Sequence, residues 1–281
     1  MSPLQTRQAT DAAARRDALV ERLFEATVGA WDLLGVYLGD RLGLHRALAE
    51  GGSLTAGELA AASATHERYV REWLEQQAAS GILDVDDAAA APSERRYRLP
   101  AGHDEALLEE SSLNLIAPIG QLVVACVRPL DALLEAFRTG DGIPYSDYGA
   151  DLHEGQARFT RPMFENLVGT EWLPSIPDVD SRLRADPPAR VADVACGEGY
   201  SSIAIARAYP KVRVHGIDSD QASIEAAREH LGESDVQDRV TFHACDAAQV
   251  ELGGGCDLVT DLRGAARHEL PGPGPAFLPS P

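Results

Sequence analysis

Lysine is almost missing from this sequence, and aromatic residues are few. Lys211 is the only lysine among 281 residues, and aromatic side chains make up 6% of the chain. The 25 basic and 44 acidic side chains give a formal net charge of −19 at pH 7. A surface this acidic repels phosphate backbones and anionic lipids, so the composition argues against general binding to nucleic acid or to a membrane surface.

Paired cysteines and long apolar runs are missing too. The four cysteines stand apart in the sequence, at Cys126, Cys196, Cys245 and Cys256. They form no C-x-x-C pair and no zinc-type spacing with histidine, so we expect no metal site and a reducing, cytoplasmic compartment. The longest apolar run, residues 115–127, is short and contains Pro118 and Gly120, so no membrane span is expected. The N-terminus shows no apolar core of a secretory signal.

Helical periodicity dominates the first fifty residues. The first twelve or so are polar and alanine-rich, and we expect them to be loose. From Arg16 on, apolar residues recur every three or four positions and predict an amphipathic helix with the stripe Val20, Phe24, Val28, Trp31 and Leu34. Leucines at 42, 44 and 48 continue this periodicity until Gly51 stops it.

A helix-turn-helix pattern with a hairpin follows. Thr55 and Glu58 form a capping-box pattern that opens a helix through Ala62. A second helix ends at Gly81, and its predicted apolar face consists of Tyr69, Val70, Trp73, Leu74 and Ala78. Residues 82–85 and 96–99 predict two short strands. This order is typical of a winged helix-turn-helix.

Two hypotheses compete for the winged-helix unit: DNA binding through the second helix, or packing and dimerisation. Between residues 66 and 75 the second helix carries two arginines against three glutamates. A recognition helix normally presents net positive charge to phosphates, so the charge pattern favours the second hypothesis.

A strand, a glycine turn and a helix carry the chemical signal further along the chain. Residues 191–195 predict a strand, and residues 201–209 a helix after the turn. A second strand, 212–217, ends at Asp218, and two more are expected at 239–244 and 257–260. Alternating strands and helices predict a parallel, doubly wound sheet.

The turn has the sequence Asp193-Val-Ala-Cys-Gly-Glu-Gly199. A dinucleotide fingerprint would need a third glycine where Ser202 stands, and a phosphate loop would need a lysine. The turn instead resembles the first motif of class I S-adenosylmethionine-dependent methyltransferases, an acidic residue followed by G-x-G-x-G, with Ala195 in place of the first glycine. Asp218 and Asp246 match the acids that this family places near the ribose and the adenine.

The resemblance implies S-adenosylmethionine as cofactor, with its carboxylate at the N-terminus of the helix after the turn and Asp193 near its sulfonium. The implied cofactor-binding residues are Asp193, Ala195, Cys196, Gly197, Gly199, Tyr200, Asp218, Ser219, Cys245, Asp246 and Ala247. The residues themselves leave a structural alternative open for several of these: Asp193 could only cap the turn, Asp246 could be an ordinary helix cap, and Cys196 and Cys245 are expected as small buried residues rather than nucleophiles. No catalytic base is assigned.

The whole chain resembles bacterial small-molecule methyltransferases that dimerise through a winged-helix domain. The expected fold is α/β: an N-terminal all-helical winged-helix domain plus an incomplete Rossmann-like doubly wound parallel sheet. The expected parts are a dimerisation domain (16–103), a helical connector and lid (104–185), the cofactor domain (186–262) and a Gly/Pro-rich tail (263–281). The expected activity is methyl transfer to a small molecule, at oxygen, by a homodimer. The alternatives are a non-catalytic dimeric regulator that binds the cofactor or an effector, and a winged-helix DNA-binding regulator.

The resemblance stops after Thr260. The family fold implies seven strands in the order 3-2-1-4-5-7-6, and the sequence predicts four. The remaining residues are rich in proline and offer His268 without a strand to position it. Residues 264–270 can be encoded so that a one-base shift reads Val-Leu-His-Asp-Met-Ser, which resembles related methyltransferases just after strand four. We therefore expect a frameshift here and impaired turnover.

Overall fold

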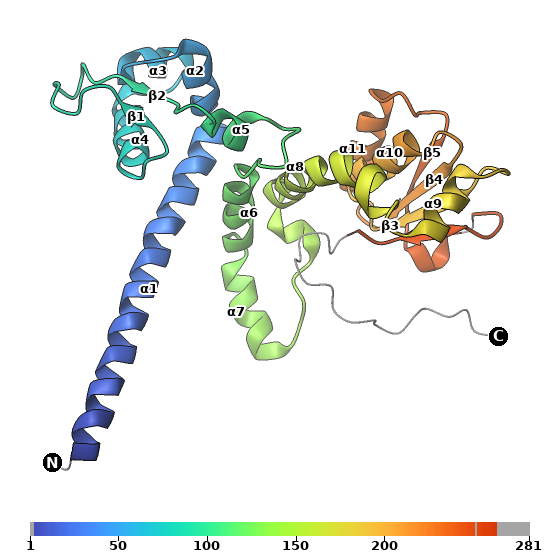
Figure 1. Cartoon of the computed structure of the whole chain (residues 1–281), viewed down its shortest axis with the longest axis horizontal. Helices are drawn as coiled ribbons and strands as arrows, with labels where there is room; N and C mark the ends of the chain where they lie inside the picture. The colour runs from blue at the N-terminus through green and yellow to red at the C-terminus, as the bar shows by residue number, and fades with distance from the viewer. Residues whose placement is uncertain (1–2, 251, 263–281) are drawn as a thin grey trace. The chain divides into compact units, whose positions relative to one another are not determined.

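The computed structural model describes residues 3–250 and 252–262. The chain divides into two compact units, residues 1–155 and 156–281, and the boundary lies within helix α8 (Ala150–Leu167). Each unit is described by itself (Figure 1).

The first unit is built of helices and one short hairpin. In chain order its elements before α8 are α1 (Pro3–Arg41), α2 (Leu44–Gly51), α3 (Ala56–Ala62), α4 (Glu67–Ala79), β1 (Asp84–Val85), β2 (Tyr97–Arg98), α5 (His103–Leu108), α6 (Pro118–Val127), α7 (Leu130–Thr139) and the 3-10 turn η1 (Tyr145–Tyr148).

The N-terminal helix starts earlier than expected. The helix begins at Pro3, so residues 3–12, which were expected to be loose, are helical. They consist mostly of good helix formers, and proline is tolerated in a first helical turn. The helical periodicity expected up to Gly51 is confirmed: Gly43, with a left-handed φ of 67°, separates α1 from α2, which runs from Leu44 to Gly51. Figure 1 shows the N-terminal half of α1 extending away from helices α2 to α4.

The winged-helix pattern is confirmed. Both bonds of the capping box are present: the Glu58 amide donates to Thr55 Oγ1 over 3.3 Å, and the Thr55 amide donates to Glu58 Oε2 over 2.9 Å. Strands β1 and β2 pair antiparallel, so the domain is helical but carries a two-stranded wing. Trp73 and Leu74 are buried in its core, as expected, whereas Tyr69 is 74% exposed and does not belong to the apolar face. Tyr69 lies in the first turn of α4, where its ring is 5.8 Å from the His66 ring rather than in the core.

The second unit contains the sheet. After α8 its elements are the π-turn η2 (Val168–Trp172), α9 (Pro177–Arg184), β3 (Arg190–Val194), α10 (Tyr200–Ala208), β4 (Arg213–Asp218), α11 (Gln221–Gly232), β5 (Val240–Ala244), the 3-10 turn η3 (Ala247–Gln249) and β6 (Leu258–Thr260).

The four strands of this sheet are parallel in the order β5-β4-β3-β6. This order confirms the expected arrangement 3-2-1-4. Val191, Val214 and Phe242 are buried in one core with residues of α10 and α11, so both helices cover the same face of the sheet. The carboxyl ends of all four strands then lie along one edge, where ligands of such sheets bind.

No helix within residues 3–250 and 252–262 is long and apolar enough to cross a membrane. The tail, including His268 and the region of the expected frameshift, lies outside the described residues.

Candidate functional site

The candidate site lies at the carboxyl edge of the sheet in the second unit. The loop after β3 contains Ala195 to Gly199, the loop after β4 contains Ser219 and Asp220, and the loop after β5 leads into η3. The fold thus brings the residues expected to hold the cofactor to one edge, because parallel strands end on the same side.

Asp193 is the buried centre of this edge. It is 1% exposed, and its Oδ2 accepts hydrogen bonds from Ser201 Oγ at 2.6 Å and Ser202 Oγ at 2.7 Å. Its Oδ1 accepts a bond from Thr260 Oγ1 at 2.8 Å. Burial raises the pKa of Asp193, and the three hydroxyl donors oppose that shift. The carboxylate therefore fastens β3 to the start of α10 and to β6, which is closer to the structural alternative than to a place beside a sulfonium.

The turn after Asp193 uses left-handed backbone conformations. The φ angles are 54° at Ala195, 53° at Gly197 and 82° at Gly199. A Cβ on Gly199 would overlap the Phe242 ring, whereas a Cβ on Gly197 would meet nothing within 4 Å. Glycine is thus required at 199 by both strain and packing, and the open space beside Gly197 leaves room for a ligand at the backbone.

Asp218 connects the second strand to the turn. Its Oδ2 accepts the Gly197 amide at 3.0 Å, and its Oδ1 accepts the Asp220 amide at 2.9 Å. The side chain is half-buried at the tip of β4. A carboxylate can accept about four hydrogen bonds, so capacity remains for the two hydroxyls of a ribose.

The loop after β5 places Asp246 in the open. It caps η3 by accepting the Ala248 amide at 2.9 Å, and its side chain is exposed. Ser219 is exposed as well, and Cys245 and Ala247 are half-buried in the same edge. Cys196 is buried, and burial raises the pKa of its thiol, so it is a packing residue rather than a nucleophile.

Comparison with known proteins relates both units to known domains. Residues 191–273 match the family model described as "Methyltransferase domain", and residues 30–108 match an "Rv2258c-like winged HTH domain". The chain carries a methyltransferase domain behind a winged helix-turn-helix domain. The "Trans-aconitate 2-methyltransferase" of Streptomyces coelicolor is 34% identical over 90 residues, which are 32% of this chain and 28% of that protein. The chain thus covers less than a third of the length of this curated relative.

Solved structures resemble the chain in both units. The mitomycin 7-O-methyltransferase MmcR has a TM-score of 0.63 and 21% identity, over 89% of this chain and 72% of that one. Human N-acetylserotonin methyltransferase, solved in complex with SAM, has a TM-score of 0.62 and 17% identity, over 86% of this chain and 70% of that one. The chain therefore has the winged-helix and class I S-adenosylmethionine-dependent methyltransferase fold of these proteins.

Sequence reasoning missed several residues around the turn of the methyltransferase domain. Ser202, which occupies the position of a third glycine, bonds to Asp193, and Phe242 fills the space that Gly199 and Gly216 leave. Motif spacing could have drawn attention to Ser202 only. The partner of Tyr200 comes from the end of α11: His230 stacks on the Tyr200 ring with 4.6 Å between centroids.

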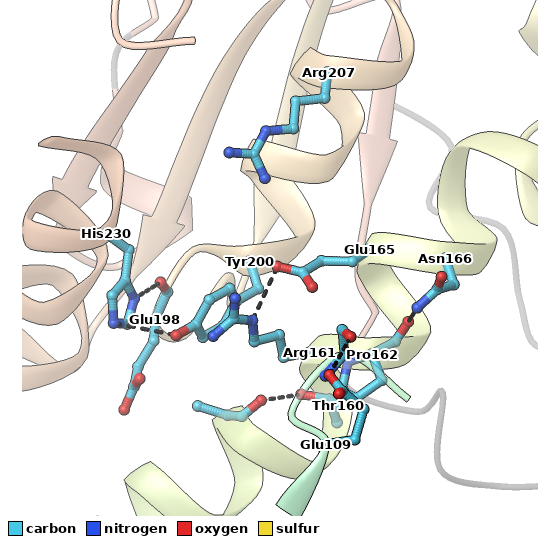
Figure 2. Close-up of polar contacts among 12 residues, drawn as sticks. Glu109, Thr160, Arg161, Pro162, Glu165, Asn166, Glu198, Tyr200, Arg207 and His230 are labelled. Carbon is cyan, nitrogen blue, oxygen red and sulfur yellow. Dashed lines mark hydrogen bonds and ion pairs between the residues drawn. The ribbon is translucent and has the colours of Figure 1, made fainter. Parts of the chain in front are cut away.

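A cation also lies beside the first turn of α10. Figure 2 shows the Arg161 side chain, from α8, next to Tyr200, and its guanidinium carbon is 5.0 Å from the centroid of the Tyr200 ring. Arg161 Nε donates to Glu165 Oε1 over 2.9 Å. No pattern in the sequence links α8 to the glycine turn, so this contact could not be foreseen.

Proposed function

We propose that this protein transfers a methyl group from S-adenosylmethionine to an oxygen of a small-molecule acceptor. The observation that carries the proposal is the glycine turn: its amide at Gly197 is held by Asp218, and the half-buried carboxylate keeps capacity for further donors. The match to a methyltransferase family model over residues 191–273 supports the same activity.

The residues at the edge fit the proposed cofactor. Asp218 would accept the ribose hydroxyls, Asp246 would lie near the adenine, and the open space beside Gly197 would admit the methionine part. The N-terminus of α10 and the Arg161 guanidinium offer positive potential to a carboxylate. The bound cofactor would supply the reactive methyl group, and the chain would orient it. The turn residues Ala195, Cys196 and Gly199 shape the turn, and Ser219, Cys245 and Ala247 border it.

Titration calorimetry with S-adenosylhomocysteine tests the cofactor site. We expect the wild-type chain to bind, and Asp218→Ala to lose about 2 kcal/mol of binding free energy because two ribose hydroxyls lose their acceptor. The matched control is Asp238→Ala, since Asp238 belongs to the same unit and its side chain is 80% exposed. Equal affinity of Asp218→Ala and wild type would remove Asp218 from the site, and no binding by the wild type would refute the proposal.

The acceptor side is tested separately. Transfer of tritiated methyl groups from S-adenosylmethionine to a panel of small phenols and carboxylic acids would demonstrate catalysis. A chain that binds S-adenosylhomocysteine but methylates no member of a broad panel would favour the alternative of a cofactor-binding regulator.

The winged-helix domain serves dimerisation in this proposal. Along α1 the side chains of Phe24 and Trp31 are 70% and 63% exposed, in a stripe with Val20 and Val28. An apolar stripe of this length is typical of a protein interface. The arginines of the hairpin are paired with carboxylates, for example Arg96 with Glu58 at 2.9 Å, which speaks against a DNA contact there. Light scattering of the intact chain should give a dimer mass, and of Phe24→Glu a monomer mass.

A further inference from the structure

His230, in the last turn of α11, contacts the glycine turn between β3 and α10. His230 Nδ1 lies 3.1 Å from the carbonyl oxygen of Glu198, and His230 Nε2 lies 3.2 Å from the Tyr200 hydroxyl oxygen (Figure 2). One imidazole thus bridges the residue between the two glycines and the first residue of α10.

The two contacts define which ring nitrogen of His230 carries the proton. A carbonyl oxygen can only accept, so Nδ1 must donate to Glu198. In the neutral ring Nε2 is then the acceptor, and the Tyr200 hydroxyl donates to it. Burial raises the pKa of Tyr200, so the phenol keeps the proton that this bond requires.

Three consecutive residues of the turn are tethered in this way. The Gly197 amide donates to Asp218, the Glu198 carbonyl accepts from His230, and the Gly199 amide donates to the Cys196 carbonyl over 3.0 Å. The Gly199 bond is local to the turn, and the Gly197 bond goes to Asp218, the residue expected to bind the ribose. His230 is the one that ties the middle of the turn to α11.

We propose that His230 is a positioning residue for the cofactor turn: through its Nδ1–H bond to the Glu198 carbonyl it holds the left-handed turn in the form that binds S-adenosylmethionine. This inference rests on the proposed function. It explains why a histidine lies in the last turn of α11 beside Tyr200, since an aliphatic side chain could pack there but could not hold the carbonyl.

Three variants of the full chain test the role. His230→Leu keeps apolar packing but cannot donate, and we expect its dissociation constant for S-adenosylhomocysteine to rise about fivefold to tenfold, the effect of one lost hydrogen bond at a rigid site. His230→Asn places an amide donor near the Nδ1 position, and we expect affinity within about twofold of wild type. The matched control is His215→Asn, a half-buried histidine of β4 that bonds to His243 and lies on the other face of the sheet from α10 and α11.

The outcomes separate this inference from the proposed function. Failure of the wild type to bind refutes the proposed function. Binding by the wild type, together with unchanged affinity in His230→Leu or an equal loss in His230→Asn and His230→Leu, overturns the positioning role. Thermal unfolding of each variant is recorded beside the affinity, because a merely structural residue would lower the melting temperature in both His230 variants without splitting their affinities.

The position of the proton on the His230 ring provides a second test, which is read in the wild-type chain itself. Long-range proton–nitrogen NMR of the wild-type chain should show His230 with the proton on Nδ1, assigned by the loss of its signals in His230→Asn. A ring protonated only on Nε2 could not donate to Glu198, and it would overturn the inference even if the chain binds no cofactor.

Discussion

Each unit of this protein contains a buried titratable side chain where a helix meets its neighbours, Asp193 in the sheet unit and His45 in the winged-helix unit, but the two differ in their hydrogen-bond partners. Asp193 in the sheet unit accepts bonds from three hydroxyls. His45 in the winged-helix unit is 0% exposed, and neither ring nitrogen has a hydrogen-bond partner of good geometry among the described residues.

The surroundings of His45 are apolar and tight. Its ring lies 5.2 Å from the Trp73 ring, and it rests on Gly39 of α1 so closely that any Cβ there would overlap it. Gln77 is buried beside it, also with an unpartnered side-chain oxygen. Burial lowers the pKa of His45 to about 4, against the weaker opposing influence of Gln77 and Asp40.

The two units differ in what determines how their elements pack together. In the sheet unit a fully bonded carboxylate determines how strand, turn and helix meet, so polar groups define the site. In the winged-helix unit shape determines the contact, since a flat face of α1 receives a neutral ring. A buried polar network stabilises the fold when every member is hydrogen-bonded. A buried imidazole without hydrogen-bond partners is tolerated only while it stays uncharged.

The largest effect on this comparison is expected from removal of the hydrogen-bonded carboxylate of Asp193. Asp193→Ala leaves the hydroxyls of Ser201, Ser202 and Thr260 buried without their acceptor, and we expect a loss of about 3 kcal/mol in the free energy of unfolding. Urea denaturation monitored by tryptophan fluorescence and circular dichroism measures it. Asp193→Asn keeps one acceptor oxygen and should lose clearly less; equal losses would mean that volume rather than hydrogen bonding matters at this position.

A pH titration tests the other half of the comparison, the buried neutral ring of His45. The folded state holds the pKa of His45 at about 4, below its ordinary value of 6.5, so the unfolded chain takes up the proton first as pH falls. The stabilisation is fully present above pH 6.5 and is lost progressively toward pH 4. Between pH 7 and pH 5 this single residue should lower the free energy of unfolding by about 2 kcal/mol.

The control for that titration is His45→Gln, which cannot take up a proton. The difference in unfolding free energy between wild type and His45→Gln isolates the histidine, because the carboxylates titrate alike in both chains. A difference that stays constant from pH 7 to pH 5 would show that the ring is not held neutral by burial.

The sequence predicted more of the sheet unit than of the connections within either unit. Strand positions followed from apolar runs and glycine turns, the strand order followed from the resemblance to the methyltransferase family, and Asp218 followed from its place at a strand tip. Likewise, Thr55 and Glu58 predicted a helix start that the structure confirms. These signals are local, and each residue's role is determined by neighbours within a few positions.

What could not be predicted depends on contacts between distant segments. Thr260 and Asp193 are 67 residues apart in the sequence, and His230 and Glu198 are 32 apart. No periodicity in the sequence predicts either hydrogen bond. The exposure of Tyr69 was misjudged because spacing alone places it beside the core stripe. The start of α1 was misjudged because polar composition was taken as disorder, although helix formers dominate it.

The mildest test of the contrast compares two strained alanines, one in each unit. Ala64, in the exposed turn between α3 and α4, has a φ of 52°, and Ala195, in the half-buried cofactor turn, has a φ of 54°. An L-residue in this region costs about 1 kcal/mol, and glycine removes that strain while adding some freedom to the unfolded chain. We expect Ala64→Gly and Ala195→Gly each to raise the free energy of unfolding by about 0.5 kcal/mol, as a higher urea midpoint at constant slope. Since the bonds of Asp193 and Asp218 impose the backbone around 195, and only local turn geometry imposes it at 64, Ala195→Gly should keep its gain when S-adenosylhomocysteine is added. A loss of stability in Ala195→Gly but not in Ala64→Gly would show that the backbone at 195 is not left-handed. The hydrogen bonds of Asp193 and Asp218 would then not determine the conformation of this turn.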